Sequence, residues 1–197
     1  MLTYLACVLV LSGPAAWTAR EYPFRDATFS VDERGTVALR LGKRTVIRAT
    51  RLWLAGPDWK SAVTDAGELR QTGAHQGGTF SLVRLREPVS GGEWDVTIRV
   101  GPVAQGLAVS YSAKPLAEMD INELGIVLDL PIEQWSGKPV LLWPSQELTF
   151  PETLPTDHHF ASNHCVAVVL GSGAERVTVR LDKPGLAKLQ DCRKWQG

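Results

Sequence analysis

Trp94-Asp95-Val96-Thr97-Ile98-Arg99-Val100 is the stretch that decides the fold class. Apolar and polar side chains alternate along it, which places Trp94, Val96, Ile98 and Val100 on one face. Successive side chains of a strand point to opposite faces of a sheet, so this pattern predicts a half-buried strand.

Similar short runs recur along the chain, separated by Gly, Pro, Asn and Asp. Examples are Gly106 to Ser112, Asn122 to Leu130 and Glu175 to Leu181. Turn signals at roughly 8–12-residue spacing are typical of sandwiches, and only Pro184 to Leu189 is predicted to be briefly helical. The sequence therefore predicts an all-β fold, an antiparallel two-sheet β-sandwich. The expected core residues are Trp94, Val96, Ile98, Leu107, Val109, Tyr111, Val177, Val179 and Leu181.

The N-terminal residues resemble a targeting segment. Leu2 to Leu11 is uncharged and dominated by apolar residues, and small residues follow up to Ala16. This is typical of a signal peptide and too short to span a membrane. We therefore expect a signal peptide over 1–16, a secreted or periplasmic location and one sandwich domain over 17–197. The last residues, 191–197, resemble a loop leading into another strand, so the domain is a candidate for the N-terminal part of a longer protein.

Removal of the signal peptide leaves two cysteines, Cys165 and Cys192. An even number in an exported chain favours a disulfide between them. The alternative is two buried free thiols, because free cysteine is common in cores and Cys165 begins an apolar run.

The chain carries 21 basic and 21 acidic residues and no net charge. Proteins that bind nucleic acid normally present a basic face, so we expect no nucleic-acid partner. Seven tryptophans offer large apolar rings instead, and such rings stack on the apolar faces of sugars. Trp59 and Trp135 lie in turn-like contexts, which makes them candidates for contact with a neutral oligosaccharide or polysaccharide.

Two polar clusters are the other candidates for a site. Asp157-His158-His159 forms a polar loop, and Glu123 lies in the predicted strand Asn122 to Leu130, on the face opposite Leu124. Both also suit ordinary solvent-exposed positions, because loops and open sheet faces commonly carry charge. The spacings of known zinc motifs do not occur, so we expect no metal and no cofactor.

Two stretches resemble secreted bacterial β-sandwich modules that precede or accompany glycoside hydrolase domains, including the galactose mutarotase-like supersandwich. They are Asn122 to Pro131, with Trp135-Ser136-Gly137 after it, and Phe29 to Thr36. The resemblance implies a carbohydrate context and a possible downstream catalytic domain. Mutarotase-like enzymes use a His and a Glu at the sugar, and Glu123 with His158 or His159 would be the candidates here.

These observations predict an exported, non-catalytic module that binds a glycan and accompanies a glycan-degrading domain. The first alternative is a sugar epimerase, or a glycosidase or lyase of the supersandwich type, that uses Glu123 and a histidine. The second alternative is a structural or interaction domain of an envelope protein.

Overall fold

The computed structural model describes residues 3–5, 20–75, 78–191 and 193. The sequence predicts a single domain over 17–197, whereas the chain divides into two compact units, Met1–Leu130 (unit 1) and Pro131–Gly197 (unit 2). Of the predicted signal peptide, only 3–5 lie within the described residues. No described helix is long and apolar enough to cross a membrane.

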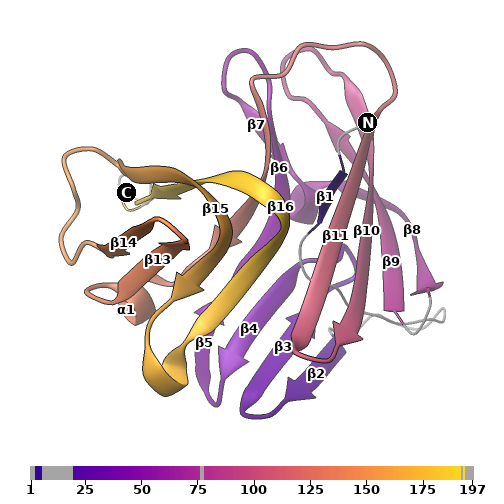
Figure 1. The fold of residues 1–197 in the computed structure, drawn as a ribbon. Helices are drawn as coiled ribbons and strands as arrows, with labels where there is room; N and C mark the ends of the chain where they lie inside the picture. The colour runs from indigo at the N-terminus through magenta and orange to yellow at the C-terminus, as the bar shows by residue number, and fades with distance from the viewer. Residues whose placement is uncertain (1–2, 6–19, 76–77, 192, 194–197) are drawn as a thin grey trace. The chain divides into compact units, whose positions relative to one another are not determined.

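The first layer of unit 1 is a five-stranded antiparallel sheet in the order β1-β11-β10-β9-β8 (Figure 1). Its long central hairpin pairs Ile98 with Tyr111 and Val96 with Ala113. Alternation of apolar and polar residues gives this sheet one buried face, as the sequence predicts. The strands are β1 (Thr3–Leu5), β8 (Glu68–His75), β9 (Gly78–Arg86), β10 (Glu93–Val103) and β11 (Gly106–Pro115).

The second layer of unit 1 consists of two smaller antiparallel sheets, in the orders β12-β6-β7 and β2-β3-β4-β5. A 3-10 turn over Thr64–Ala66 follows β7. The strands are β2 (Arg20–Phe24), β3 (Ala27–Val31), β4 (Val37–Leu41), β5 (Arg44–Ile47), β6 (Ala49–Ala55), β7 (Ser61–Val63) and β12 (Glu123–Asp129).

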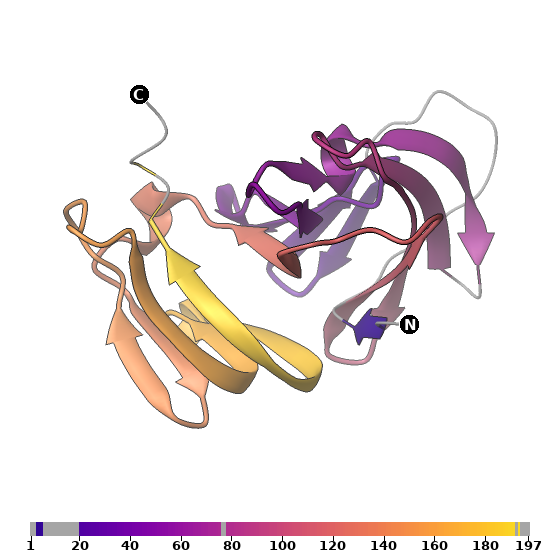
Figure 2. The ribbon, with the colours of Figure 1, turned by 90° about the horizontal axis from the view of Figure 1, so that it is seen from above.

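The two layers can be followed in Figures 1 and 2. One apolar core lies between them. Val96 and Ile98 from β10 and Leu52 and Leu54 from β6 are at most 1% exposed. The core is so tight at Gly35, where φ is +76°, that a Cβ would come within 2.7 Å of Ile98. The predicted all-β antiparallel sandwich is confirmed, and six of the nine expected core residues lie in this core: Trp94, Val96, Ile98, Leu107, Val109 and Tyr111.

Unit 2 is a four-stranded antiparallel sheet in the order β14-β13-β15-β16 with one short helix. The other three expected core residues, Val177, Val179 and Leu181, lie on its edge strand β16 and are only half-buried. A 3-10 turn over Gly173–Glu175 joins the last two strands. The elements are α1 (Ile132–Trp135), β13 (Pro139–Trp143), β14 (Gln146–Thr149), β15 (His159–Leu170) and β16 (Val177–Gln190).

The predicted helix over Pro184 to Leu189 is wrong, because this segment is part of strand β16. Its residues alternate between exposed and half-buried, a period of two. The register passes from Ala167↔Arg180 to Cys165↔Gly185, so Pro184 lies in a bulge. Proline has no N–H for the ladder and is tolerated at bulges and on edge strands, which explains its position.

Candidate functional site

The most exposed tryptophan of the described chain stands on the turn between β6 and β7. Trp59 is 61% exposed and has a backbone φ of +66°, which is uncommon for a residue other than glycine. Two backbone hydrogen bonds close the turn, from Trp59 N to Gly56 O (3.0 Å) and from Gly56 N to Lys60 O (3.1 Å). The turn therefore holds a large aromatic ring in solvent.

Asn122 holds this turn from one side. Its backbone N–H donates to Ala55 O, and its side-chain amide donates to Pro57 O, each over 2.9 Å. Asn122 directly precedes β12. Its two hydrogen bonds therefore connect the start of β12 to Ala55, the last residue of β6, and to Pro57 in the turn.

Glu87 also supports this turn, through contact with Gly56. Glu87 was not predicted from the sequence. It is fully buried, and its carboxylate accepts hydrogen bonds from the Ser90 hydroxyl (2.6 Å) and the Val89 backbone N–H (3.1 Å). The Ser90 hydroxyl, and after it the Ser90 backbone N–H, hold the pKa of Glu87 below its usual range. Gly56 packs directly on this carboxylate, so the β9–β10 turn supports the Trp59 turn.

A groove of about 440 Å³ is lined by β7, which begins two residues after Trp59. Three of its four charged lining residues form ion pairs, and the fourth, Arg86, donates a hydrogen bond to the Gly91 carbonyl (3.4 Å). Arg84 lies 2.8 Å from Asp95 and 3.3 Å from Glu93, and Glu68 lies 2.5 Å from Arg70. The groove thus offers many hydrogen-bonding groups whose charges are largely balanced. Its lining residues include Ser61, Glu68, Arg84, Arg86, Pro88 and Glu93.

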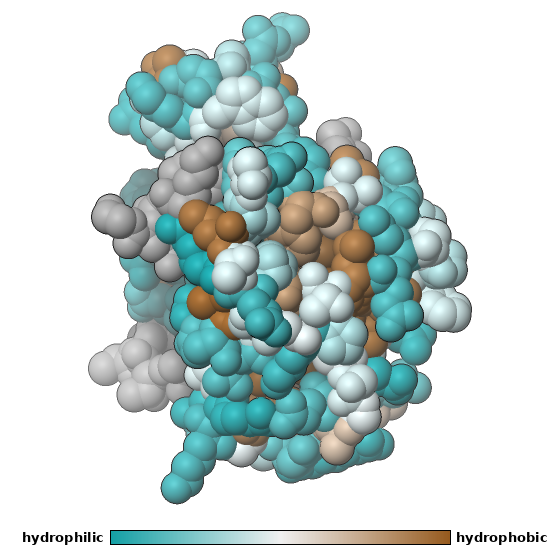
Figure 3. Space-filling model, turned by 90° about the vertical axis from the view of Figure 1, so that its left-hand side faces the viewer, coloured by the Kyte–Doolittle hydropathy of each residue, from teal (hydrophilic) through white to brown (hydrophobic). Residues whose placement is uncertain are grey.

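Two further apolar side chains emerge from the loops linked to this turn. Val89, from the β9–β10 turn, is 55% exposed, and Leu116, just after β11, is 44% exposed. Leu116 N donates to Glu93 O, so its segment is tied to the same end of unit 1, the upper end in Figure 1. Figure 3 shows a face of the molecule on which hydrophobic residues surface in several groups among hydrophilic ones.

Glu123 lies at the root of the Trp59 turn, opposite Ala55 in the β12–β6 ladder. Leu124 and Ile126 pack against the core of unit 1, so Glu123 and Asp129 point to the other face, as the alternation predicts. Trp53 shares that outer face, opposite Gly125. Glu123 is half-buried and therefore reachable by solvent.

Trp135, the second tryptophan predicted as a ligand contact from its turn-like context, is buried in the structure and does not present its ring to solvent. It closes helix α1 and is only 2% exposed. Its ring lies 6.4 Å from that of Phe150, and the Lys138 ammonium lies 5.7 Å from the ring centre. Large rings beside a loop are often buried, and here the ring fills the core of unit 2.

The Asp157-His158-His159 loop also belongs to unit 2, directly before and at the start of β15. Asp157 accepts a hydrogen bond from the His159 backbone N–H (3.0 Å), and its carboxylate lies 4.0 Å from His158 Nδ1. The two imidazole rings are 4.4 Å apart. Glu123 belongs to unit 1, so neither unit by itself contains the Glu–His pair that the enzyme alternative requires.

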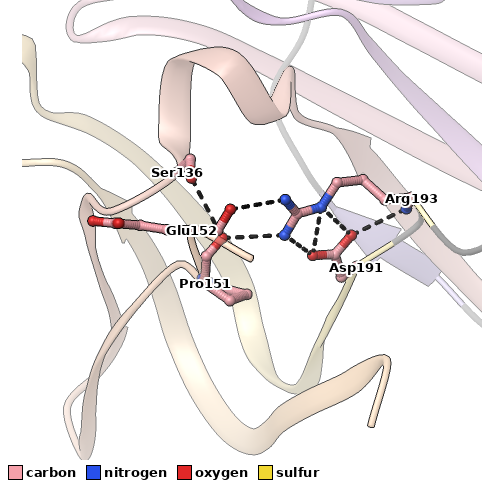
Figure 4. Close-up of polar contacts among 5 residues, drawn as sticks. All are labelled: Ser136, Pro151, Glu152, Asp191 and Arg193. Atoms are coloured by element: carbon pink, nitrogen blue, oxygen red, sulfur yellow. Dashed lines mark hydrogen bonds and ion pairs between the residues drawn. The ribbon is translucent and has the colours of Figure 1, made fainter. Parts of the chain in front are cut away.

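A second polar cluster that the sequence did not predict anchors this loop (Figure 4). Asp191 is buried and accepts three side-chain hydrogen bonds from Arg193, at 2.6 to 3.0 Å. Arg193 also donates to the carbonyls of Pro151 and Glu152, while Asp191 N donates to His158 O. The Arg193 guanidinium lowers the pKa of Asp191 below its usual range. The only sequence signal is an acid and an arginine two residues apart, which is too common to single out.

Cys165 is buried and free, so the structure does not support the predicted disulfide. Burial raises the pKa of its thiol. Cys192 itself lies outside the described residues.

No family model, curated protein or solved structure matches the chain. Within the described ranges, no three His, Cys, Asp or Glu side chains converge as a metal site would require. The geometry of the Trp59 turn and its groove is therefore the main guide to function.

Proposed function

We propose that the protein is an exported, non-catalytic module that binds an oligosaccharide or polysaccharide, and that Trp59 makes the main contact. The observation that carries this proposal is the 61% exposure of a tryptophan on a turn fixed by Asn122 and Glu87. Exposing so large an apolar ring costs solvation free energy, which makes an isolated, firmly held tryptophan a candidate contact surface.

A stacked sugar ring suits this arrangement physically. Tryptophan has an apolar face and one N–H donor, and it loses little conformational freedom when its turn is already ordered. The neighbouring groove supplies hydrogen-bonding groups whose charges are balanced by Asp95, Glu93 and Arg70. A shallow site with one aromatic wall and balanced charges favours a neutral glycan, bound weakly.

Each of the two alternative functions is also favoured by one observation. The exposure of Val89 and Leu116, on loops linked to the Trp59 turn, favours an interaction module whose partner is a protein with an apolar surface. The position of Glu123 at the root of the same turn is the observation that favours a sugar-modifying enzyme.

Calorimetric titration with a panel of plant and microbial oligosaccharides tests the proposal. We expect weak binding of at least one neutral glycan, loss of binding in Trp59→Ala, and unchanged binding in Trp143→Ala. Trp143 is the matched control because it is also exposed, at 52%, but belongs to unit 2. Absence of heat from every glycan would favour the interaction module, and turnover abolished by Glu123→Gln would favour the enzyme.

A further inference from the structure

The sheet of unit 2 has an inner face that is buried and an outer face that carries exposed apolar side chains. The inner face includes four residues that are at most 9% exposed: Val140, Leu142, Val168 and Leu170. Trp143, at the end of β13, alternates onto the outer face and is 52% exposed. Val166, in the bulge of β15, and Leu186, on β16, are 38% and 53% exposed. Apolar side chains gathered on one exposed face indicate an interaction surface.

The strand register arranges the outer face in two neighbouring rows, because directly opposed residues of antiparallel strands share a face. The first row crosses all four strands, from β14 to β16, and consists of Glu147, Leu141, Val169 and Thr178. The second row crosses three strands and consists of Trp143, Ala167 and Arg180. The middle of this face is therefore apolar, with an acid at its β14 edge and a base at its β16 edge.

The charges at the two edges have no partner within unit 2. Glu147 and Arg180 are both exposed, and neither forms an ion pair with another described residue. The next charges along β16, Asp182 and Lys183, lie in the bulge and have opposite signs. A face with one negative and one positive edge is complementary to a copy of itself, whereas a partner of a single charge sign would be repelled at one edge.

A second copy of the chain fits this pattern through a two-fold axis, which places the same patch on both sides of a contact. An axis in the plane of contact that crosses the line from Glu147 to Arg180 at its midpoint, at a right angle, exchanges the two positions. Each copy then sets its acid against the base of the other. Facing sheets pack about 10 Å apart, a distance that a glutamate and an arginine side chain can span together. The midpoint lies between β13 and β15, so the apolar residues meet near the axis.

We propose that the outer face of unit 2 is a self-association surface through which two copies of the chain form a symmetric dimer. Trp143 lies at its apolar centre, and two Glu147–Arg180 ion pairs lie at its rim. An apolar centre inside a polar rim is the usual anatomy of a protein interface, and tryptophan is enriched among the residues that contribute most to binding. The dimer does not rest on the proposed function, because Trp59 belongs to unit 1.

Sedimentation velocity of the full chain over a wide range of concentration tests the proposal. Four strands spaced by about 4.8 Å form a small interface, so we expect a reversible dimer that dissociates on dilution. Trp143→Ala should raise the dissociation constant about tenfold or more. Trp59→Ala, at an equally exposed tryptophan of unit 1, is the matched control and should leave the dissociation constant unchanged.

Charge reversal identifies the symmetry of the contact. Arg180→Glu and Glu147→Arg should each weaken self-association about fivefold or more, because two attractive pairs become two repulsive ones. An equimolar mixture of these two variants should dimerise again, since both pairs are then attractive. Lys43→Glu, at an exposed lysine of unit 1, is the control for the change in net charge. A chain that stays monomeric at every concentration, a dimer unaffected by Trp143→Ala, or a mixture that associates no better than its components would overturn the proposal.

Discussion

Gly56 packs so closely on the carboxylate of Glu87 that no side chain fits between them. The two residues belong to different turns, and their contact joins the base of the Trp59 turn to the β9–β10 turn. Because Glu87 is itself fixed by Ser90 and Val89, the position of Trp59 depends on a buried acid that does not contact solvent.

Gly56→Ala is predicted to displace the Trp59 turn. The added methyl group has to move either the turn or the buried carboxylate, which costs about 1–3 kcal/mol in a packed interior. We expect a lower free energy of unfolding in a denaturant titration, and weaker glycan binding. Gly125→Ala is the control, because a Cβ there meets nothing within 4 Å. Equal stability of the two variants would show that the Gly56–Glu87 contact does not constrain the turn.

Trp135→Ala is predicted to destabilise unit 2 by about 3–5 kcal/mol, the usual cost of removing a buried tryptophan. The ring contacts Phe150 and lies against Gly171, so its loss leaves a cavity in the core. Trp135→Phe should recover part of this loss. Thermal unfolding of the three proteins measures it. A stable Trp135→Ala protein that had lost glycan binding would restore Trp135 as a ligand contact.

The Asp191–Arg193 pair is predicted to make unit 2 less stable in acid. The pKa of Asp191 is lowered in the folded state, so its stabilising contribution is complete above the unfolded value of about 3.9 and is lost as the pH falls through the lower, folded pKa. Unfolding free energies of the wild type and Asp191→Asn should differ at neutral pH and converge in strong acid. Asp157→Asn, at an exposed carboxylate, is the control. A difference that persists unchanged to pH 2 would contradict this account.

Cys165 is predicted to resist alkylation in the native protein and to react without reductant once the protein is unfolded. It is 1% exposed, and burial raises the pKa of its thiol, which keeps it in the less reactive protonated form. Mass spectrometry after labelling under native and denaturing conditions measures both states. If Cys165 is labelled only after reduction, the disulfide expected from cysteine counting exists after all.

The sequence predicts the sandwich well where alternation is regular. Residues 94–100 and 106–112 lie in β10 and β11 with the expected faces buried. Where apolar residues occupy every second position, only one face of the strand can pack on the core. The sequence-based prediction fails for Pro184 to Leu189. There a proline in a bulge of an edge strand resembles the end of a strand and the start of a helix. The extra residues of β16 between Arg180 and Gly185 form a bulge opposite the segment from Cys165 to Ala167, and the local sequence pattern does not reveal this pairing.

The candidate site was only partly predictable, because exposure depends on contacts distant in sequence. Trp59 and Trp135 have similar local surroundings, yet one is exposed and the other is buried against Phe150. Glu87 looks like an ordinary surface acid, and only the fold places Gly56 over it. The pairing of Asp191 with Arg193, which anchors the predicted histidine loop, likewise depends on the end of β16 returning to His158.

The most direct test of the central claim is to follow the indole N–H signals of the tryptophans by heteronuclear NMR while a neutral oligosaccharide is added. Assignment by Trp59→Phe and Trp135→Phe identifies the two signals of interest. The proposed function predicts that the Trp59 indole signal shifts with saturation while that of Trp135 stays in place. A titration in which the oligosaccharide binds and the Trp59 signal does not move would contradict it.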